Sequence, residues 1–227
     1  MAQDLFLSDP DHARISAAVG RAEAQSAGEI VTIMADSSDG YNDVALVWSA
    51  GIALLALGVV ATFAPFYLAL VDRVLGLWEQ HWTPRQVLGL AATIASLKFI
   101  GMWLILLWRP LRLALTPAGV KHARVRARAV TLFKVGAERR TTGRTGVLIY
   151  LSQAEHRAEI VADEAISSQV SPEVWGAAMA AMLPHLKRGD AASGLCAAIE
   201  QVGAVLAQHL PRAADDKNEL PDRLIEV

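Results

Sequence analysis

The chain has 227 residues, a formal net charge of -2 and an apolar content of 53%. This length leaves room for about one small domain beside any membrane segment, and the charge excludes a chain that is acidic or basic throughout. Cysteine occurs once, as Cys196, which excludes an internal disulfide framework and fits a reducing compartment. The charged first 27 residues lack the apolar core of a cleavable signal peptide, so we expect an internal segment to direct targeting.

The N-terminal part predicts a helix followed by a buried strand. A side-chain cap followed by Pro10 is typical of a helix start, and Gly28 marks the end of that helix. Residues 29–35 (EIVTIMA) are β-branched and mostly apolar, as expected for a strand that is buried on both faces. Residues 36–43 (DSSDGYND) are rich in turn-forming residues and predict a linker.

Two long apolar runs follow the linker. Residues 45–71 contain no charge, and residues 87–108 contain only Lys98. Because a bilayer core about 30 Å thick needs about 20 apolar residues per helix, both runs are long enough to cross it. We therefore predict a two-helix transmembrane hairpin over residues 44–108. The alternative is a buried soluble hairpin, but a soluble helix normally keeps a polar outer face.

Flanking charges predict the orientation of the hairpin. Acidic residues precede the first run, whereas Arg109 and other basic residues follow the second. The positive-inside rule then places both chain termini and the soluble part in the cytoplasm, with the turn 72–86 outside. We expect an integral protein of the plasma or inner membrane. The basic residues expected to meet anionic lipid are Arg112, Lys121, Arg124, Arg126 and Arg128. Nucleic acid is the alternative partner for such a cluster, but no aromatic residue interleaves with these arginines, and we expect no nucleic-acid binding.

The residues after the hairpin predict a helix, two strands and two further helices. We expect the first helix over 118–135, strands at 146–152 and 157–163 joined by a short turn, and helices that begin near Ser171 and Asp190. The charged tail 211–227 predicts disorder. The expected inner face of the first helix is Val120, Ala123, Ala127, Val130 and Phe133 or Lys134. The expected inner face of the helix after Ser171 is Trp175, Met179, Met182 and Leu186.

Without the apolar hairpin, the first two strands flank a helix and form a strand–helix–strand unit with a parallel crossover. We therefore predict one α/β domain that is split in sequence into residues 8–43 and 109–210. Neither part buries its strand without the other.

Four short segments, taken in order and spacing, point to a family. They are Gly28-Glu29-Ile30-Val31, Thr145-Gly146-Val147-Leu148-Ile149, Arg157 to Asp163, and a helix closing on Lys187-Arg188-Gly189-Asp190. Together they resemble the TPM domain, over roughly residues 12–42 and 117–210. The resemblance implies a small three-layer α/β/α sandwich with a mixed sheet, here interrupted after the first strand by the transmembrane hairpin.

The resemblance also implies function. Members of the family are often membrane-tethered, some are reported as weak acid phosphatases, and some bind calcium through acidic residues at the strand ends. Many carry Asp-Asn-Gly ahead of the second strand, where this chain has Arg144-Thr145-Gly146. This exchange of an acidic for a basic residue argues against a metal-assisted phosphatase.

The polar candidates for a binding site lie at the ends of predicted strands, where open α/β sheets gather ligands. They are Glu29, Arg144, Glu155, Asp163 and Glu164. Converging carboxylates there would hold calcium or another divalent cation. The alternative is that Glu155 belongs to an ordinary turn, Asp163 and Glu164 begin a helix or loop, and Arg144 pairs with one of them. Because Arg144 already supplies positive charge, we expect no bound metal or other cofactor.

No phosphate-binding loop, dinucleotide-binding glycine pattern, nucleophile elbow or paired His or Cys ligands occur in the sequence. We expect a membrane-anchored, non-enzymatic module that binds or helps assemble membrane components; the alternative is a weak, divalent-metal-dependent phosphatase acting on phosphoric esters. Lys98 is costly inside a span and is a functional candidate, with tolerance through local membrane thinning as the alternative. The expected partners are membrane lipids, another membrane protein and a second copy bound through the hairpin.

Overall fold

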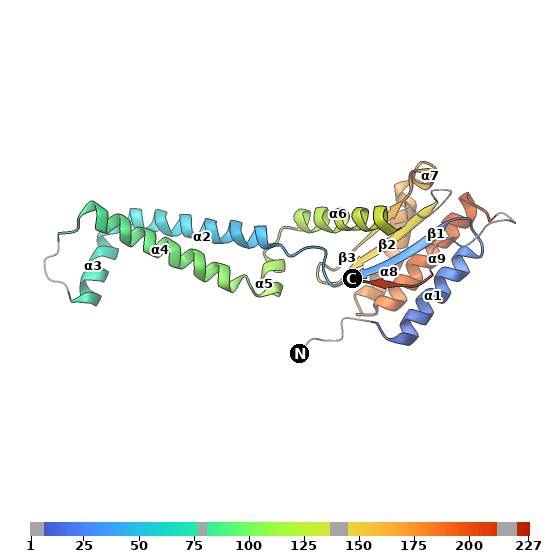
Figure 1. Ribbon diagram of the computed structural model, residues 1–227, viewed down its shortest axis with the longest axis horizontal. Coiled ribbons are helices and arrows are strands. Elements are labelled where there is room, and N and C mark those ends of the chain that lie inside the picture. Colours follow the sequence, from blue (N-terminus) through green and yellow to red (C-terminus); the bar gives the residue numbers. More distant parts are fainter. Residues whose placement is uncertain (1–6, 77–80, 137–144, 213–221) are drawn as a thin grey trace. The chain divides into compact units, whose positions relative to one another are not determined.

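The structure is a computed structural model that describes residues 7–76, 81–136, 145–212 and 222–227. The chain divides into two compact units (Figure 1). The first unit, Met1–Asp39 with Ala118–Val227, contains the sheet, and the second, Gly40–Pro117, is helical.

The sheet is assembled from chain segments that precede and follow the helical unit in sequence. β1 (Glu29–Ala35) and β2 (Gly146–Ser152) pair in parallel, with Glu29 opposite Gly146. β3 (Arg157–Ala162) runs antiparallel to β2, and β4 (Ile225–Glu226) runs parallel to β1. Among the described residues the strand order is β3-β2-β1-β4. The predicted mixed sheet and the predicted parallel pairing of β1 with β2 are confirmed.

Helices cover both faces of the sheet (Figure 1). On one face, α6 (Ala118–Gly136) packs on alternate residues of β1 and β2, such as Val31 and Leu148. On the other face lie α1 (Asp9–Glu23), α8 (Pro172–Leu186) and α9 (Ala191–His209), packed on the intervening residues, such as Ile30 and Val147. A short helix, α7 (Glu164–Ser167), follows β3. The three-layer α/β/α arrangement is therefore confirmed.

The face of α6 that packs on the sheet differs from the predicted one. Phe133 is buried as predicted, but so are Val125 and Ala129, which were not predicted, whereas Ala123 and Ala127 are exposed. The helical period was right but its phase was wrong. Apolar or small residues alternate with basic residues over much of this helix, so no single face stands out by composition, and contact with the sheet decides the phase.

The C-terminal segment was expected to be disordered, and this expectation is wrong for residues 222–227. Leu224 is buried in the core, and β4 adds an edge strand to the sheet. The N–H of Val227 donates to the carbonyl of Met34 at 3.0 Å. A few apolar residues are enough here because β1 offers a preformed edge. Residues 213–221 of the expected tail lie outside the described residues.

The second unit is built around two long apolar helices, α2 (Asn42–Thr62) and α4 (Pro84–Ile105), which pack against each other. Both are candidate membrane spans by length and composition. Large apolar side chains such as Leu54 and Leu97 are more than 60% exposed, a surface that suits lipid better than water. α9 also meets the length and composition criteria, but Leu195 and Ile199 bury it in the core of the first unit.

The bounds of the two apolar helices differ from the predicted spans. The first helix ends at Thr62 and not at residue 71, because Pro65 lies in the first turn of a separate helix, α3 (Ala64–Leu75). Proline lacks the N–H that would continue the hydrogen bonds of α2. The second helix begins at Pro84 behind a capping box formed by Thr83 and Gln86. A short helix, α5 (Arg109–Ala114), follows it.

Candidate functional site

The structure places the predicted site residues at opposite ends of the sheet. Glu29 begins β1 opposite Gly146, and Asp163 lies just after β3, beside the same glycine. Glu155 lies in the turn between β2 and β3, at the far end of these strands. Strands of seven residues separate their ends by about 20 Å. The structure therefore does not bring Glu155 together with Glu29 and Asp163.

Glu155 is buried and accepts hydrogen bonds from the N–H of Ser38, at 2.9 Å, and from the hydroxyl of Ser152. The Ser38 hydroxyl also lies 3.0 Å from both Ser152 Oγ and Tyr150 Oη, and burial raises the pKa of Tyr150. This network joins the loop after β1 to the β2–β3 turn. Glu155 therefore belongs to a turn, which was the alternative to a binding site.

Asp163 and Glu164 lie where the helix-start alternative expected them. Asp163 is buried just before α7, and its Oδ2 accepts the N–H of Gly146 at 3.0 Å. Glu164 is exposed in the first turn of α7. Arg144 lies outside the described residues. Within the described ranges, no group of three or more His, Cys, Asp or Glu side chains is placed to hold a metal ion.

A second group of carboxylates lies at the amino end of β1, where the predicted candidate Glu29 is joined by two residues that the sequence did not predict. Glu23, Glu29 and Asp222 line a cavity of about 70 Å³ together with Arg212. The Glu23 carboxylate accepts the N–H of Ile30 at 2.9 Å. Burial raises the pKa of Glu23 to about 8; the Ile30 hydrogen bond opposes this shift, and the nearby Glu29 and Asp222 carboxylates reinforce it. Glu23 therefore carries a proton at neutral pH.

Two of the basic residues of α6 pair with acidic side chains of the same unit. Arg124 pairs with Asp39, and Arg126 lies 3.5 Å from Glu159. His122 Nδ1 lies 3.2 Å from the other oxygen of Glu159. Lys121 is partly exposed and Arg128 exposed, and in the second unit Arg112 donates to Asn42 Oδ1 at 2.9 Å. Lipid contact by these residues stays a prediction.

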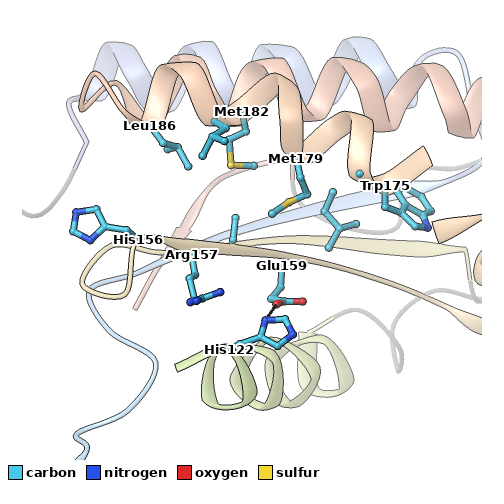
Figure 2. A pocket seen from close by; sticks show the side chains of 12 residues that line it. His122, His156, Arg157, Glu159, Trp175, Met179, Met182 and Leu186 are labelled. Carbon is cyan, nitrogen blue, oxygen red and sulfur yellow. Dashed lines mark ion pairs between the residues drawn. The ribbon is translucent and has the colours of Figure 1, made fainter. Parts of the chain in front are cut away.

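A groove of about 410 Å³ lies beside β3 in the first unit (Figure 2). We call it the β3 groove. Its upper wall in Figure 2 is α8, which contributes Trp175, Met179 and Leu183 among other apolar side chains. Arg157 and Glu159 point from β3 to the opposite side, toward His122 of α6. The β3 groove thus has one apolar wall and one charged wall, separated by the strand.

The outer edge of β3 exposes hydrogen-bonding groups of its backbone. Asp163 donates its N–H to the carbonyl of Gly146 at 3.0 Å, in register with the β2–β3 ladder. Hydrogen-bonded pairs alternate along an antiparallel ladder, so the N–H and C=O of Ala158, Ile160 and Ala162 point away from β2. No strand pairs with this side of β3 among the described residues. The groove therefore contains an open strand edge.

The sequence did not identify the β3 groove, although it identified part of its wall. Trp175 and Met179 were expected to be core residues of α8, but only Met182 is fully buried, and Leu183 is 50% exposed. The reason is that β3 is an edge strand, so no further strand lies beneath the outer part of α8. Large apolar residues on a helix that extends beyond the last strand are the signal for such a groove.

Lys98 lies in the second unit, on α4. It is exposed and lines a hollow of about 560 Å³ with apolar residues of α2 and with Tyr67 of α3. None of the described residues that line this hollow is acidic. A functional role for Lys98 stays a prediction.

Comparisons with known proteins agree with this fold. Residues 118–205 match the family model described as TPM domain. Among solved structures, the chain is similar to the NMR structure of BA42 protein from the psychrophilic bacterium Bizionia argentinensis, with 18% identity, a TM-score of 0.58 and full coverage of both chains. At this identity the likeness supports the fold alone. No curated protein matches the chain.

Proposed function

We propose that this chain, which carries a TPM domain over residues 118–205, is a membrane-anchored, non-enzymatic module that binds another membrane protein. The β3 groove is the proposed binding surface, and an extended segment of the partner would lie along β3. The observation that carries the proposal is the open edge of β3 beside a wall of incompletely buried apolar side chains. Such an edge accepts an added strand through main-chain hydrogen bonds.

Energetics favour an occupied groove. Leu183 is 50% exposed, and Trp175 and Met179 are partly exposed. Each 100 Å² of apolar surface removed from water gains about 2.5 kcal/mol. A bound strand would cover these side chains and, at the same time, pair with the outward N–H and C=O groups of Ala158 and Ile160. Main-chain pairing and apolar burial thus act at the same place.

The second unit supports the membrane part of the proposal. α2 has 21 residues and α4 has 22, which correspond to lengths of about 31 and 33 Å, close to the thickness of a bilayer core. We propose that both helices cross the membrane and that the basic flank at Arg109 and Arg112 keeps the TPM domain in the cytoplasm. Anchoring would raise the effective concentration of the domain near membrane partners.

A weak phosphatase is the second candidate function, since acidic side chains do occupy both ends of the sheet. Their contacts favour the binding role. Glu155 accepts from Ser38 and Ser152, Asp163 accepts from Gly146, and Asp39 pairs with Arg124. These carboxylates stabilise turns and strand ends, and they do not converge on one point.

The test is site-specific photo-crosslinking of the full chain in native membranes. A photoreactive residue at Leu183, inside the groove, should crosslink to a membrane protein, whereas one at the exposed Gln169, outside it, should not. Ala158→Pro removes an outward N–H and should abolish the crosslink, because proline at a strand edge blocks pairing on that side. Ala158→Val keeps the N–H and should preserve it.

Two outcomes would contradict the proposal. In the first, crosslinking from position 183 is equal in the Ala158→Pro and Ala158→Val variants. In the second, the purified full chain hydrolyses a generic phosphate monoester in the presence of Ca²⁺ or Mg²⁺, and both variants keep that activity. The second result would favour the phosphatase.

A further inference from the structure

We infer that the β3 groove selects an extended segment in which acidic and apolar residues alternate, with the acidic side chains facing α6 and the apolar side chains facing α8. This inference rests on the proposed function, because it specifies the chemistry of the segment that the groove binds. It follows from the different character of the two walls.

The wall toward α6 carries more positive than negative groups. Among the described residues that line the groove, the acidic one is Glu159, which already pairs with His122 and Arg126. Arg157, the neighbouring side chain on the same face of β3, has no ion pair within the described parts of the chain. His156 adds an exposed imidazole at the end of the groove. A partner carboxylate next to Arg157 would therefore complete the charge balance of this wall.

The wall toward α8 is apolar. Trp175, Met179 and Leu183 face the groove, and the β3 residues on this face include Ala158. The small side chain of Ala158 leaves space between the strand and α8, which contributes to the hollow. Methionine side chains adapt to apolar partners of different shape. This wall therefore favours branched or aromatic side chains without demanding one particular residue.

Strand geometry converts the two walls into a sequence pattern. Successive side chains of a strand point to opposite faces, so a segment paired with β3 would direct every second residue toward α6 and the others toward α8. The pattern expected of the partner is acidic, apolar, acidic, apolar. A basic segment would be repelled by Arg157, and a uniformly apolar one would leave Arg157 without a counter-charge.

The test measures binding of short labelled peptides to the full chain in lipid nanodiscs by fluorescence anisotropy. Three matched peptides alternate valine with glutamate, with serine or with lysine. We expect the glutamate peptide to bind about tenfold more tightly than the serine peptide, and the lysine peptide to bind most weakly. Arg157→Glu should reverse the order of the glutamate and lysine peptides, and Arg157→Gln should bring their affinities together. Added salt should weaken binding of the glutamate peptide.

The controls separate this inference from the proposed function. If all three peptides bind equally and Ala158→Pro abolishes binding, the groove is a strand-binding site but the acidic preference is wrong. If no peptide binds, or if Ala158→Pro changes nothing, both proposals fail. If the full chain self-associates and Ala158→Pro makes it monomeric, the occupant is a second copy of the chain and the inference fails. Thermal unfolding of each variant verifies that the domain remains folded.

Discussion

The two ends of the sheet both finish in buried carboxylates, but they treat the negative charge differently. At the carboxyl end, Glu155 receives an N–H and a hydroxyl, and Asp39 pairs with Arg124. At the amino end, Glu23 lies close to two further carboxylates, Glu29 and Asp222, and burial raises its pKa to about 8. At the carboxyl end, donors satisfy the ionised groups; at the amino end Asp163 also accepts from a donor, but Glu23 keeps its proton.

This difference shows that position at a strand end does not determine what a carboxylate does. A carboxylate with two donors stabilises its loop in the ionised form. A carboxyl among like charges stabilises its surroundings only while it holds a proton. The comparison predicts that the two ends respond differently to mutation and pH.

The largest expected effect concerns Glu23 and pH. Its folded-state pKa of about 8 lies above its ordinary value of 4.5, so the folded protein holds a proton that the unfolded chain releases. Stability from this group is complete below pH 4.5 and is lost as pH rises to about 8, by up to about 1.4 kcal/mol per pH unit. Glu23→Gln keeps an oxygen acceptor for Ile30 and removes the titration. Denaturant unfolding of both proteins at several pH values measures the difference: the wild type should become progressively less stable than Glu23→Gln as pH rises from about 4.5 to about 8, and the gap should level off above pH 8. A difference that does not change with pH would contradict this assignment.

The second effect concerns Glu155 at the opposite end. Glu155→Ala should lower the free energy of unfolding by about 3 kcal/mol, because it leaves the Ser38 N–H and the Ser152 hydroxyl without their acceptor. Glu155→Gln keeps an acceptor oxygen and should cost less. The exposed Glu164→Ala is the control and should change stability by less than about 0.5 kcal/mol. Equal losses for Glu155→Ala and Glu164→Ala would mean that the network does not stabilise the turn.

A smaller effect is expected at Asp163, whose Oδ2 accepts the N–H of Gly146. Asp163→Ala should cost about 1.5 kcal/mol because the buried N–H of Gly146 loses its side-chain acceptor. Asp163→Asn retains an oxygen and should cost less than half of that. Urea unfolding measures both, and an asparagine variant as unstable as the alanine variant would show that charge, and not hydrogen bonding, matters at this position.

The smallest effect is expected for Arg124. Its side chain and that of Asp39 are 38% and 31% exposed, so solvent screens their ion pair, and Arg124→Ala should cost less than about 1 kcal/mol. The cost should diminish at high salt. A loss of stability as large as that of Glu155→Ala and insensitive to salt would contradict this prediction. It would show that Arg124 contributes to stability as a buried group does.

The sequence was sufficient where a residue pattern reflects burial directly. β1 and β2 are apolar on both faces, and their predicted bounds equal the observed ones. The phase of α6 and the end of the first apolar helix were not predictable in the same way. Contact with the sheet sets the first, and Pro65 at the start of α3 sets the second.

The candidate site was less accessible to sequence reasoning, because it depends on which strand is at the edge. The sequence predicted the β2–β3 hairpin and the apolar face of α8, but not that Trp175 and Met179 extend beyond β3. The group of Glu23, Glu29 and Asp222 was also hidden, since Asp222 belongs to a segment expected to be disordered. Long-range neighbours of this kind leave no local pattern.

The split of the domain also sets a time order for its biogenesis. Glu155 follows Ser38, its hydrogen-bond donor, by 117 residues. At a synthesis rate of about 5 to 20 residues per second, the donor waits about 6 to 23 seconds for its acceptor to be made. During that interval β1 has no β2 to pair with, while the apolar helices between them are being synthesised. Helix α6 and strand β2 can therefore join β1 only after both long helices have been synthesised.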